Sequence, residues 1–268
     1  MPASLSNKTF RLNNGVGMPA VGFGTFAASE STPDGSYRAT KAALEAGYRH
    51  LDCAWFYKNE AEIGRAIRDF LAETPSVSRA DLFVCTKVWN HLHAPEDVAW
   101  SLQNSLEALG LDYVDLFLVH WPIAAERDEH RQPRLGPDGK YIINSALTED
   151  PTPTWRAMEQ QQRSGKARAI GVSNWTVAGL RRLLDNVAEI RPAVNQLLLG
   201  WGVRRGYAVL PKSSTPARIA SNLNVPALSD ADYEDVWKVA RGRKPTRFVN
   251  MKHTFGFDLW PEEAEASV

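Results

Sequence analysis

Cysteine is scarce in this sequence of 268 residues, which contains only Cys53 and Cys85. The two have neither a CxxC spacing nor a nearby histidine at a metal-ligand interval, so we predict buried free thiols and no metal site. An excess of charge of one sign is also missing, because 31 basic residues balance 31 acidic ones. A net charge of zero gives no electrostatic basis for binding nucleic acid or a membrane surface.

Long hydrophobic runs are missing as well. The longest, LFLVHWPIAA, is too short and too interrupted to span a bilayer, and residues 1–15 lack the apolar core of a signal peptide. We therefore expect a cytoplasmic protein. Because the chain shows no low-complexity tract and no flexible linker, we expect residues 1–268 to form a single domain. We also expect a monomer.

The chain does contain a regular alternation of two patterns. Seven short runs are typical of strands, at residues 21–24, 48–52, 82–87, 115–120, 167–173, 193–196 and 207–211. Amphipathic segments, with apolar residues recurring at intervals of three and four, lie between them and predict helices. This β/α repeat indicates a sheet of parallel strands.

Several residues mark the ends of the predicted helices. Asn59, with Glu62 three residues later, predicts a capping box, and Pro95 is expected at a first-turn position. Three glycines are expected to end helices, namely Gly47, Gly110 and Gly165. These signals agree with the β/α alternation.

Two segments interrupt the alternation. Residues 123–153 are polar and turn-rich, and they follow the strand that ends in His120. They form either a solvated insertion or a loop over a functional site, and their origin favours the loop. After Asn224 we expect one amphipathic helix, capped by Ser229 and Asp232, and then the aromatic stretch HTFGFDLWPEE.

Four polar residues stand just past the ends of predicted strands. Asp52 ends YRHLD, Lys87 ends LFVCTK and His120 ends DLFLVH, while Tyr57 follows Asp52 in the loop DCAWFY. If these strands are parallel strands of a barrel, all four side chains gather at its C-terminal mouth. We call these residues the tetrad. Taken singly, each has a plain alternative as a cap, a solvated charge or a satisfied polar group; their joint placement favours a site.

The tetrad suits the reduction of a carbonyl group, which takes up a hydride at carbon and a proton at oxygen. A phenol loses its proton only near pH 10 unless its ionisation is made easier. We assign that role to Lys87, whose ammonium would lower the pKa of Tyr57, while Asp52 would hold the ammonium in place. His120 would then donate a hydrogen bond to the carbonyl oxygen and orient it.

Four motifs of the sequence resemble, in order, signatures of the aldo-keto reductases: GYRHLDCAWFYKNEAEIG, LGLDYVDLFLVHWP, ARAIGVSNW and LPKSSTPARIASN. The resemblance implies a (β/α)8 TIM barrel and the reversible, NADPH-dependent reduction of an aldehyde or ketone to an alcohol. The family's catalytic residues match Asp52, Tyr57, Lys87 and His120 without substitution. Small carbonyl and alcohol compounds are the implied substrates.

The resemblance also implies contacts to NADP(H). Ser173 and Asn174 would bind the nicotinamide carboxamide beside Gln196, and Gly24 and Thr25 would lie near the cofactor. The adenosine end would be held by Lys212, Ser213, Arg218 and Asn222.

The residues themselves favour NADP over NAD. Thr215 is a good N-cap and Pro216 suits the first helical position, so helix 216–222 offers free N–H groups to a phosphate beside two cations. The segment GFGTFA matches the glycine fingerprint of a Rossmann fold in letters only, because no helical pattern follows it.

Aromatic residues near the strand ends suggest an apolar substrate pocket. We expect Phe26, Trp89 and Trp121 to line it, although aromatic residues at strand ends are more often plain core. The family usually has tryptophan after Gly-Thr, and Phe26 stands there in this chain.

The chain departs from the family in its strand count, since a closed barrel needs eight strands and seven are predicted. We predict a barrel that lacks strand 7 and its flanking helices, with a block missing near Gln196 and Leu197. The family's ring that stacks on the nicotinamide would lie in that block. The alternative to an active reductase is therefore a catalytically impaired splice or gene-model variant, or a non-catalytic NADP(H)-binding regulator.

Overall fold

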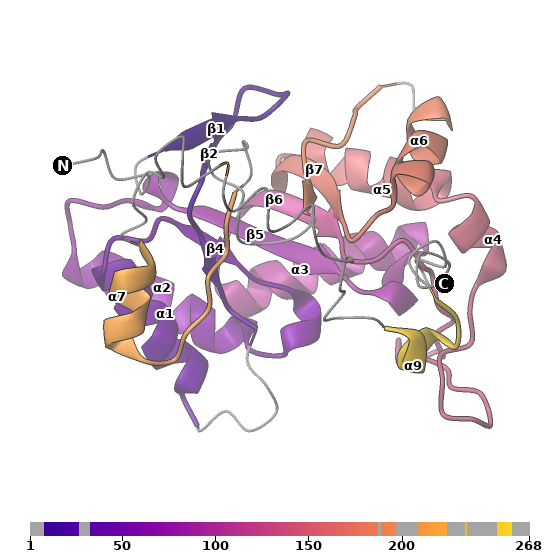
Figure 1. The fold of residues 1–268 in the computed structure, drawn as a ribbon, viewed down its shortest axis with the longest axis horizontal. Helices are drawn as coiled ribbons and strands as arrows, with labels where there is room; N and C mark the ends of the chain where they lie inside the picture. The colour runs from indigo at the N-terminus through magenta and orange to yellow at the C-terminus, as the bar shows by residue number, and fades with distance from the viewer. Residues whose placement is uncertain are drawn as a thin grey trace.

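A computed structural model of the chain describes residues 8–26, 33–186, 189–196, 208–223, 234 and 251–258. Its centre is a sheet of six parallel strands in sequential order. They are β3 (Phe23–Gly24), β4 (His50–Asp52), β5 (Phe83–Val88), β6 (Val114–Val119), β7 (Ala167–Ser173) and β8 (Asn195–Gln196). Each neighbours the next strand along the chain, which confirms the predicted β/α repeat (Figure 1).

A seventh segment pairs with the other edge of this sheet. Val209 forms a parallel bridge with Val21, its N–H donates to Ala20 O at 2.7 Å, and Gly22 N–H donates to Val209 O at 2.8 Å. All seven predicted strands are therefore aligned in one direction. Within the described residues, neither β8 nor the segment 208–210 has a partner on its outer side.

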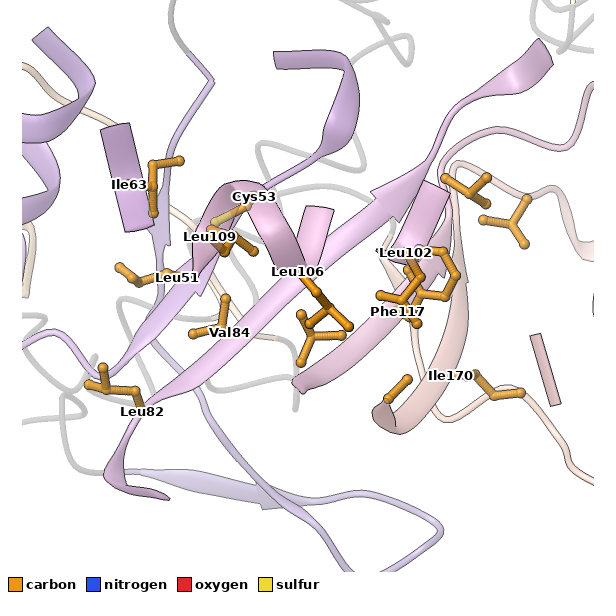
Figure 2. Packing of buried hydrophobic residues seen from close by; sticks show 14 of the residues in the cluster. Leu51, Cys53, Ile63, Leu82, Val84, Leu102, Leu106, Leu109, Phe117 and Ile170 are labelled. Carbon is orange, nitrogen blue, oxygen red and sulfur yellow. The ribbon is translucent and has the colours of Figure 1, made fainter. Parts of the chain in front are cut away.

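The helices cover one face of the sheet. They are α1 (Gly35–Glu45), α2 (Glu60–Glu73), α3 (Pro95–Leu109), α5 (Thr152–Arg163), α6 (Val177–Asn186) and α7 (Pro216–Leu223). Strand residues such as Val84, Phe117 and Ile170 point toward them and meet Leu102 and Leu106 of α3 (Figure 2). The alternating strand residues face the other way and pack in a second cluster. Burial on both faces explains the nearly continuous apolar runs of the strands.

A hairpin closes the N-terminal end of the parallel strands. It consists of β1 (Thr9–Arg11) and β2 (Gly17–Pro19), which pair antiparallel. Its Leu12 and Met18 pack against the inward-facing Cys85, Leu116 and Leu118. Because the N-terminal end is covered, the C-terminal end of the strands is left for a site.

The helix ends agree with the sequence in most places. Pro95 stands in the first turn of α3, and Gly110, at φ 65°, ends it. The predicted capping box of Asn59 and Glu62 is wrong, because Asn59 makes no side-chain cap. The Glu62 carboxylate instead accepts the N–H groups of Ser36 and Tyr37 at the start of α1. A carboxylate at a neighbouring helix N-terminus is equally well stabilised, and the contact joins α1 to α2.

The insertion at 123–153 folds over the C-terminal end of the strands. Short antiparallel bridges join Ala125 to Ile143 and Leu135 to Tyr141, and the short helix α4 (Ser145–Glu149) follows. The helix α9 (Lys252–Phe255) lies against it, and Tyr141 N–H donates to Thr254 O at 3.1 Å (Figure 1). These contacts support the interpretation of a loop over the site.

Of the tail helix predicted after Asn224, only Glu234 is described, and it is helical; the predicted caps Ser229 and Asp232 lie outside the described residues. Among the helices that the structure describes, none is long and apolar enough to cross a membrane. Cys53 and Cys85 are buried free thiols, as predicted.

Candidate active site

The tetrad gathers at the C-terminal end of the sheet, because its members follow the ends of neighbouring parallel strands. The Lys87 ammonium is 2% exposed and donates to Asp52 Oδ1 at 2.7 Å and to Cys53 O at 2.9 Å. Lys87 Nζ lies 5.2 Å from the centre of the Tyr57 ring. The His120 ring is 5.8 Å from the same phenol ring, centre to centre. The structure therefore brings all four side chains together.

Two opposing effects set the pKa of Tyr57. Burial raises the pKa of Tyr57 above its ordinary value of 10.0, and the nearby Lys87 ammonium opposes this rise without reversing it. Burial is the largest single effect on Lys87 and acts to lower its pKa, but the Asp52 carboxylate, Tyr57 and Cys85 together outweigh it, so the net direction is upward. Lys87 thus acts to lower the pKa of Tyr57, as predicted, but desolvation exceeds this attraction, so the net direction is upward. Tyr57 is a neutral phenol beside a cation.

His120 is a neutral imidazole. Its burial and the Lys87 charge hold its pKa well below 6.5. Its Nδ1 is buried and has no hydrogen-bond partner among the described residues. Trp89 packs edge-to-face on its ring, with centres 4.9 Å apart. A neutral ring in this setting can serve as a hydrogen-bond donor of fixed orientation.

The three predicted pocket residues lie around the tetrad. Phe26 is 51% exposed and packs edge-to-face on Tyr57 at 5.1 Å between ring centres, so it stands at the rim. Trp89 and Trp121 are buried and flank His120. Phe56 stacks on Trp89, and two aromatic residues that the sequence did not predict complete the wall, namely Tyr141 and Phe255. The last two come from the insertion and the tail, and no local pattern signals such distant packing.

Glu60 is another residue near the tetrad that the sequence analysis did not single out. This buried carboxyl accepts the hydroxyl of Thr86 at 2.5 Å and that of Ser105 at 2.8 Å. Burial raises its pKa. Glu60 follows Tyr57 by three residues, and Thr86 immediately precedes Lys87 in β5. The bond from Thr86 to the Glu60 carboxyl therefore joins the segment that carries Tyr57 to the strand that carries Lys87.

The predicted nicotinamide contacts lie next to the tetrad. The Asn174 amide donates to His120 O at 2.9 Å and to Ser173 Oγ at 3.1 Å, and Asn174 adopts a left-handed φ of 62°. Thr25 Oγ1 donates to Asp52 O at 2.9 Å. A Cβ at Gly24 would lie 3.0 Å from Leu210 O, a tight contact that glycine avoids. Gln196 ends β8, and its side chain is not among those described.

The predicted adenosine contacts follow the segment 208–210. Lys212 and Arg218 are exposed, and neither forms an ion pair within the described part of the chain. Ser213 Oγ accepts the N–H of Thr215 at 3.1 Å, just before α7 begins at Pro216. Two cations without carboxylate partners beside a helix N-terminus fit the extra phosphate of NADP. Asn222 lies in the last turn of the same helix.

Comparisons with known proteins identify the family of this chain. The model of the aldo/keto reductase family matches residues 20–201. The chain belongs to the aldo/keto reductase family. It is 52% identical to the glycerol 2-dehydrogenase (NADP(+)) of Hypocrea jecorina, over 97% of this chain and 100% of the relative. It is 32% identical to the aldehyde reductase YPR1 of Saccharomyces cerevisiae, over 94% of this chain and 97% of that protein.

Solved structures give the same family and fold. An aldose reductase from Schistosoma japonicum superposes with a TM-score of 0.82 at 26% identity, over 93% of this chain and 97% of that one. An aldo-keto reductase from Bombyx mori, solved in complex with NADP, superposes with a TM-score of 0.76 at 27% identity, over 92% and 96% of the two chains. The prediction of an NADP-dependent oxidoreductase of the (β/α)8 barrel type is confirmed.

Proposed function

We propose that this protein reduces aldehydes or ketones to alcohols with NADPH, and that Tyr57 is the proton donor. The observation that carries the proposal is the buried ammonium of Lys87, which Asp52 fixes at 2.7 Å and which lies 5.2 Å from the phenol ring centre. No metal ligands are needed for this chemistry. The polarising charge is supplied by the protein itself.

The four side chains have distinct tasks. The Tyr57 O–H bond breaks as its proton passes to the carbonyl oxygen, and Lys87 stabilises the phenolate that remains. His120 is neutral, so it donates one N–H to the same oxygen. We assign that proton to Nε2, because Nδ1 is buried without a partner among the described residues and an unpaired buried N–H is rarely tolerated. The bound nicotinamide supplies the hydride.

Residues at the end of β7, residues that follow the segment 208–210 and residues of α7 would hold the cofactor. Ser173 and Asn174 would bind the carboxamide, as Asn174 already links the end of β7 to His120. Lys212, Ser213 and Arg218 would bind the 2′-phosphate, with Asn222 at the adenine. Removing both cations should therefore weaken NADPH binding more than NADH binding.

The test of the mechanism is a Tyr57→Phe variant. The ring keeps its packing but has no proton to donate, so the rate of NADPH oxidation with glyceraldehyde should fall about 10²- to 10⁴-fold. Tyr113 immediately precedes β6, at the end of that strand away from His120 and the tetrad. A Tyr113→Phe variant should therefore oxidise NADPH with glyceraldehyde as fast as the parent. A Tyr57→Phe protein as fast as the parent would refute the mechanism.

The substrates proposed for this chain follow from its similarity to a glycerol 2-dehydrogenase. We propose glycerol and small hydroxylated carbonyl compounds. We further propose that residues 1–268 act as a single domain and as a monomer in the cytoplasm. The two buried free thiols are consistent with a reducing compartment. Light scattering would check the monomer, and localisation of a tagged chain would check the compartment.

A second candidate function rests on the strand count. The alignment with the Hypocrea jecorina relative spans 320 positions, 52 more than the 268 residues of this chain, although it covers 97% of the chain. We infer that an internal block near Gln196 and Leu197 is missing, which makes an impaired variant or a non-catalytic NADP(H)-binding regulator the alternative. Titration of NADPH against protein fluorescence discriminates: binding without turnover would favour the regulator, and no binding with a broad melting transition would favour the impaired variant.

A further inference from the structure

Tyr141 is a fixed polar group in the aromatic wall above the tetrad. Its backbone N–H donates to Thr254 O at 3.1 Å, and its ring packs against Phe255 with centres 6.2 Å apart. It also forms a bridge to Leu135 across the turn of the insertion. The insertion and the tail therefore hold Tyr141 from two sides, so its hydroxyl has a defined position.

The hydroxyl of Tyr141 lies one indole ring away from His120. Trp89 packs on His120 with centres 4.9 Å apart, and the Nε1–H of the same indole donates to the Tyr141 oxygen at 3.2 Å. An indole N–H can only donate, so the phenol oxygen must be the acceptor in this bond. The proton of Tyr141 itself has no acceptor among the described residues.

The half-buried side chain of Tyr141 packs against an apolar cluster. The cluster around it consists of Trp89, Trp121, Ile123 and Phe255, with Ile143 and Met251 packed against it. A mostly apolar site orients a ligand through its few polar groups, and the Tyr141 hydroxyl adds one to those of the tetrad. The indole bond also polarises the phenol, because hydrogen bonds in a chain strengthen one another.

We propose that Tyr141 determines specificity by donating a hydrogen bond to a hydroxyl oxygen of the substrate, and so selects carbonyl compounds that carry hydroxyl groups away from the carbonyl. This inference rests on the proposed carbonyl reductase activity and assigns part of its substrate selection to one phenol. An unsubstituted aldehyde would leave the Tyr141 proton unpaired, which a site of this kind disfavours.

The experiment compares a Tyr141→Phe variant with the parent on two matched pairs of aldehydes, glyceraldehyde with propanal and erythrose with butanal. One neutral hydrogen bond corresponds to a loss of about threefold to tenfold in kcat/KM for the hydroxylated member of a pair. The unsubstituted member should change less than about twofold, because phenylalanine keeps the ring packing.

The controls separate this inference from the proposed function. Turnover of propanal by the parent tests the reductase activity by itself, whatever Tyr141 does. A Tyr113→Phe variant should leave both members of each pair unchanged. Equal losses on both members, or no loss on either, would overturn the role of Tyr141. A parent inactive on all four aldehydes would overturn the proposed function and this inference with it.

Discussion

Tyr57 and His120 are both uncharged over the physiological pH range, for the same physical reason. Burial disfavours the charged form of each side chain, which raises the pKa of the phenol and lowers that of the imidazole. Between the ordinary values of about 6.5 and about 10, neither group of the free protein changes its proton count. The proton donor is thus loaded throughout this range.

The rate of carbonyl reduction should consequently depend little on pH. We expect kcat/KM for glyceraldehyde to stay level within about threefold from about pH 6.5 to 9. Alcohol oxidation, which needs the phenolate, should rise with pH over the same range. Steady-state assays in both directions in a constant-ionic-strength buffer check this. If kcat/KM for reduction instead titrated with a midpoint near neutral pH, a group other than Tyr57 would control proton transfer to the substrate.

At the scale of elements, the insertion is held to helix α3 by one buried carboxylate. Asp97 is fully buried in the first turn of α3 and accepts Arg127 Nε at 2.6 Å and Arg131 Nε at 2.8 Å. Arg131 adopts a left-handed φ of 58°, which an arginine keeps only when its contacts enforce it. These two ion pairs of Asp97, which we call the clamp, therefore position the segment that leads to Tyr141.

Replacing this carboxylate should loosen the insertion while sparing the tetrad. In an Asp97→Asn variant, trypsin should cut after Arg127 and Arg131 at least about tenfold faster, because local opening becomes easier by more than ~1.4 kcal/mol. KM for aldehydes should rise while kcat falls little. Glu96→Gln is the matched control, since Glu96 is exposed and meets Arg127 only at 3.5 Å. Similar cleavage rates in the two variants would contradict the clamp.

At the scale of the whole molecule, four buried histidines, His50 among them, make the fold sensitive to acid, because burial lowers the pKa of each. Burial lowers the pKa of His91 to about 4 and that of His93 to about 3, and His120 is lowered in the same direction. Unfolded histidine takes up a proton near pH 6.5, whereas these folded rings do not. Because the unfolded state binds more protons, stability falls as the pH drops from 6.5 toward the folded pKa values.

Urea unfolding should show this loss. Each unit of pKa difference corresponds to about 1.4 kcal/mol, so the free energy of unfolding should fall by a few kcal/mol between about pH 6.5 and 4. A His93→Asn variant should bind about one proton fewer on unfolding in this range. Equal pH slopes for variant and parent would show that His93 does not contribute.

Much of the fold could be predicted because it depends on local patterns. The apolar runs predicted the strands, and the position of Lys87 or His120 at the end of a run predicted which end of the sheet it occupies. The Asn59 capping box failed because two partners compete for Glu62, and the N–H groups of α1 are visible only after α1 and α2 pack. The three-residue spacing of a capping box carries no information about the N–H groups of another helix.

The sequence by itself determined the order of strands and helices, the family and the gathering of Asp52, Tyr57, Lys87 and His120. These follow from chain order, because parallel strands bring their C-terminal ends to the same edge. Only the tertiary structure decided the direction of the Tyr57 pKa and the place of Tyr141 in the wall above the tetrad. Desolvation and packing sum over neighbours that are far apart in the chain, so no local pattern contains them.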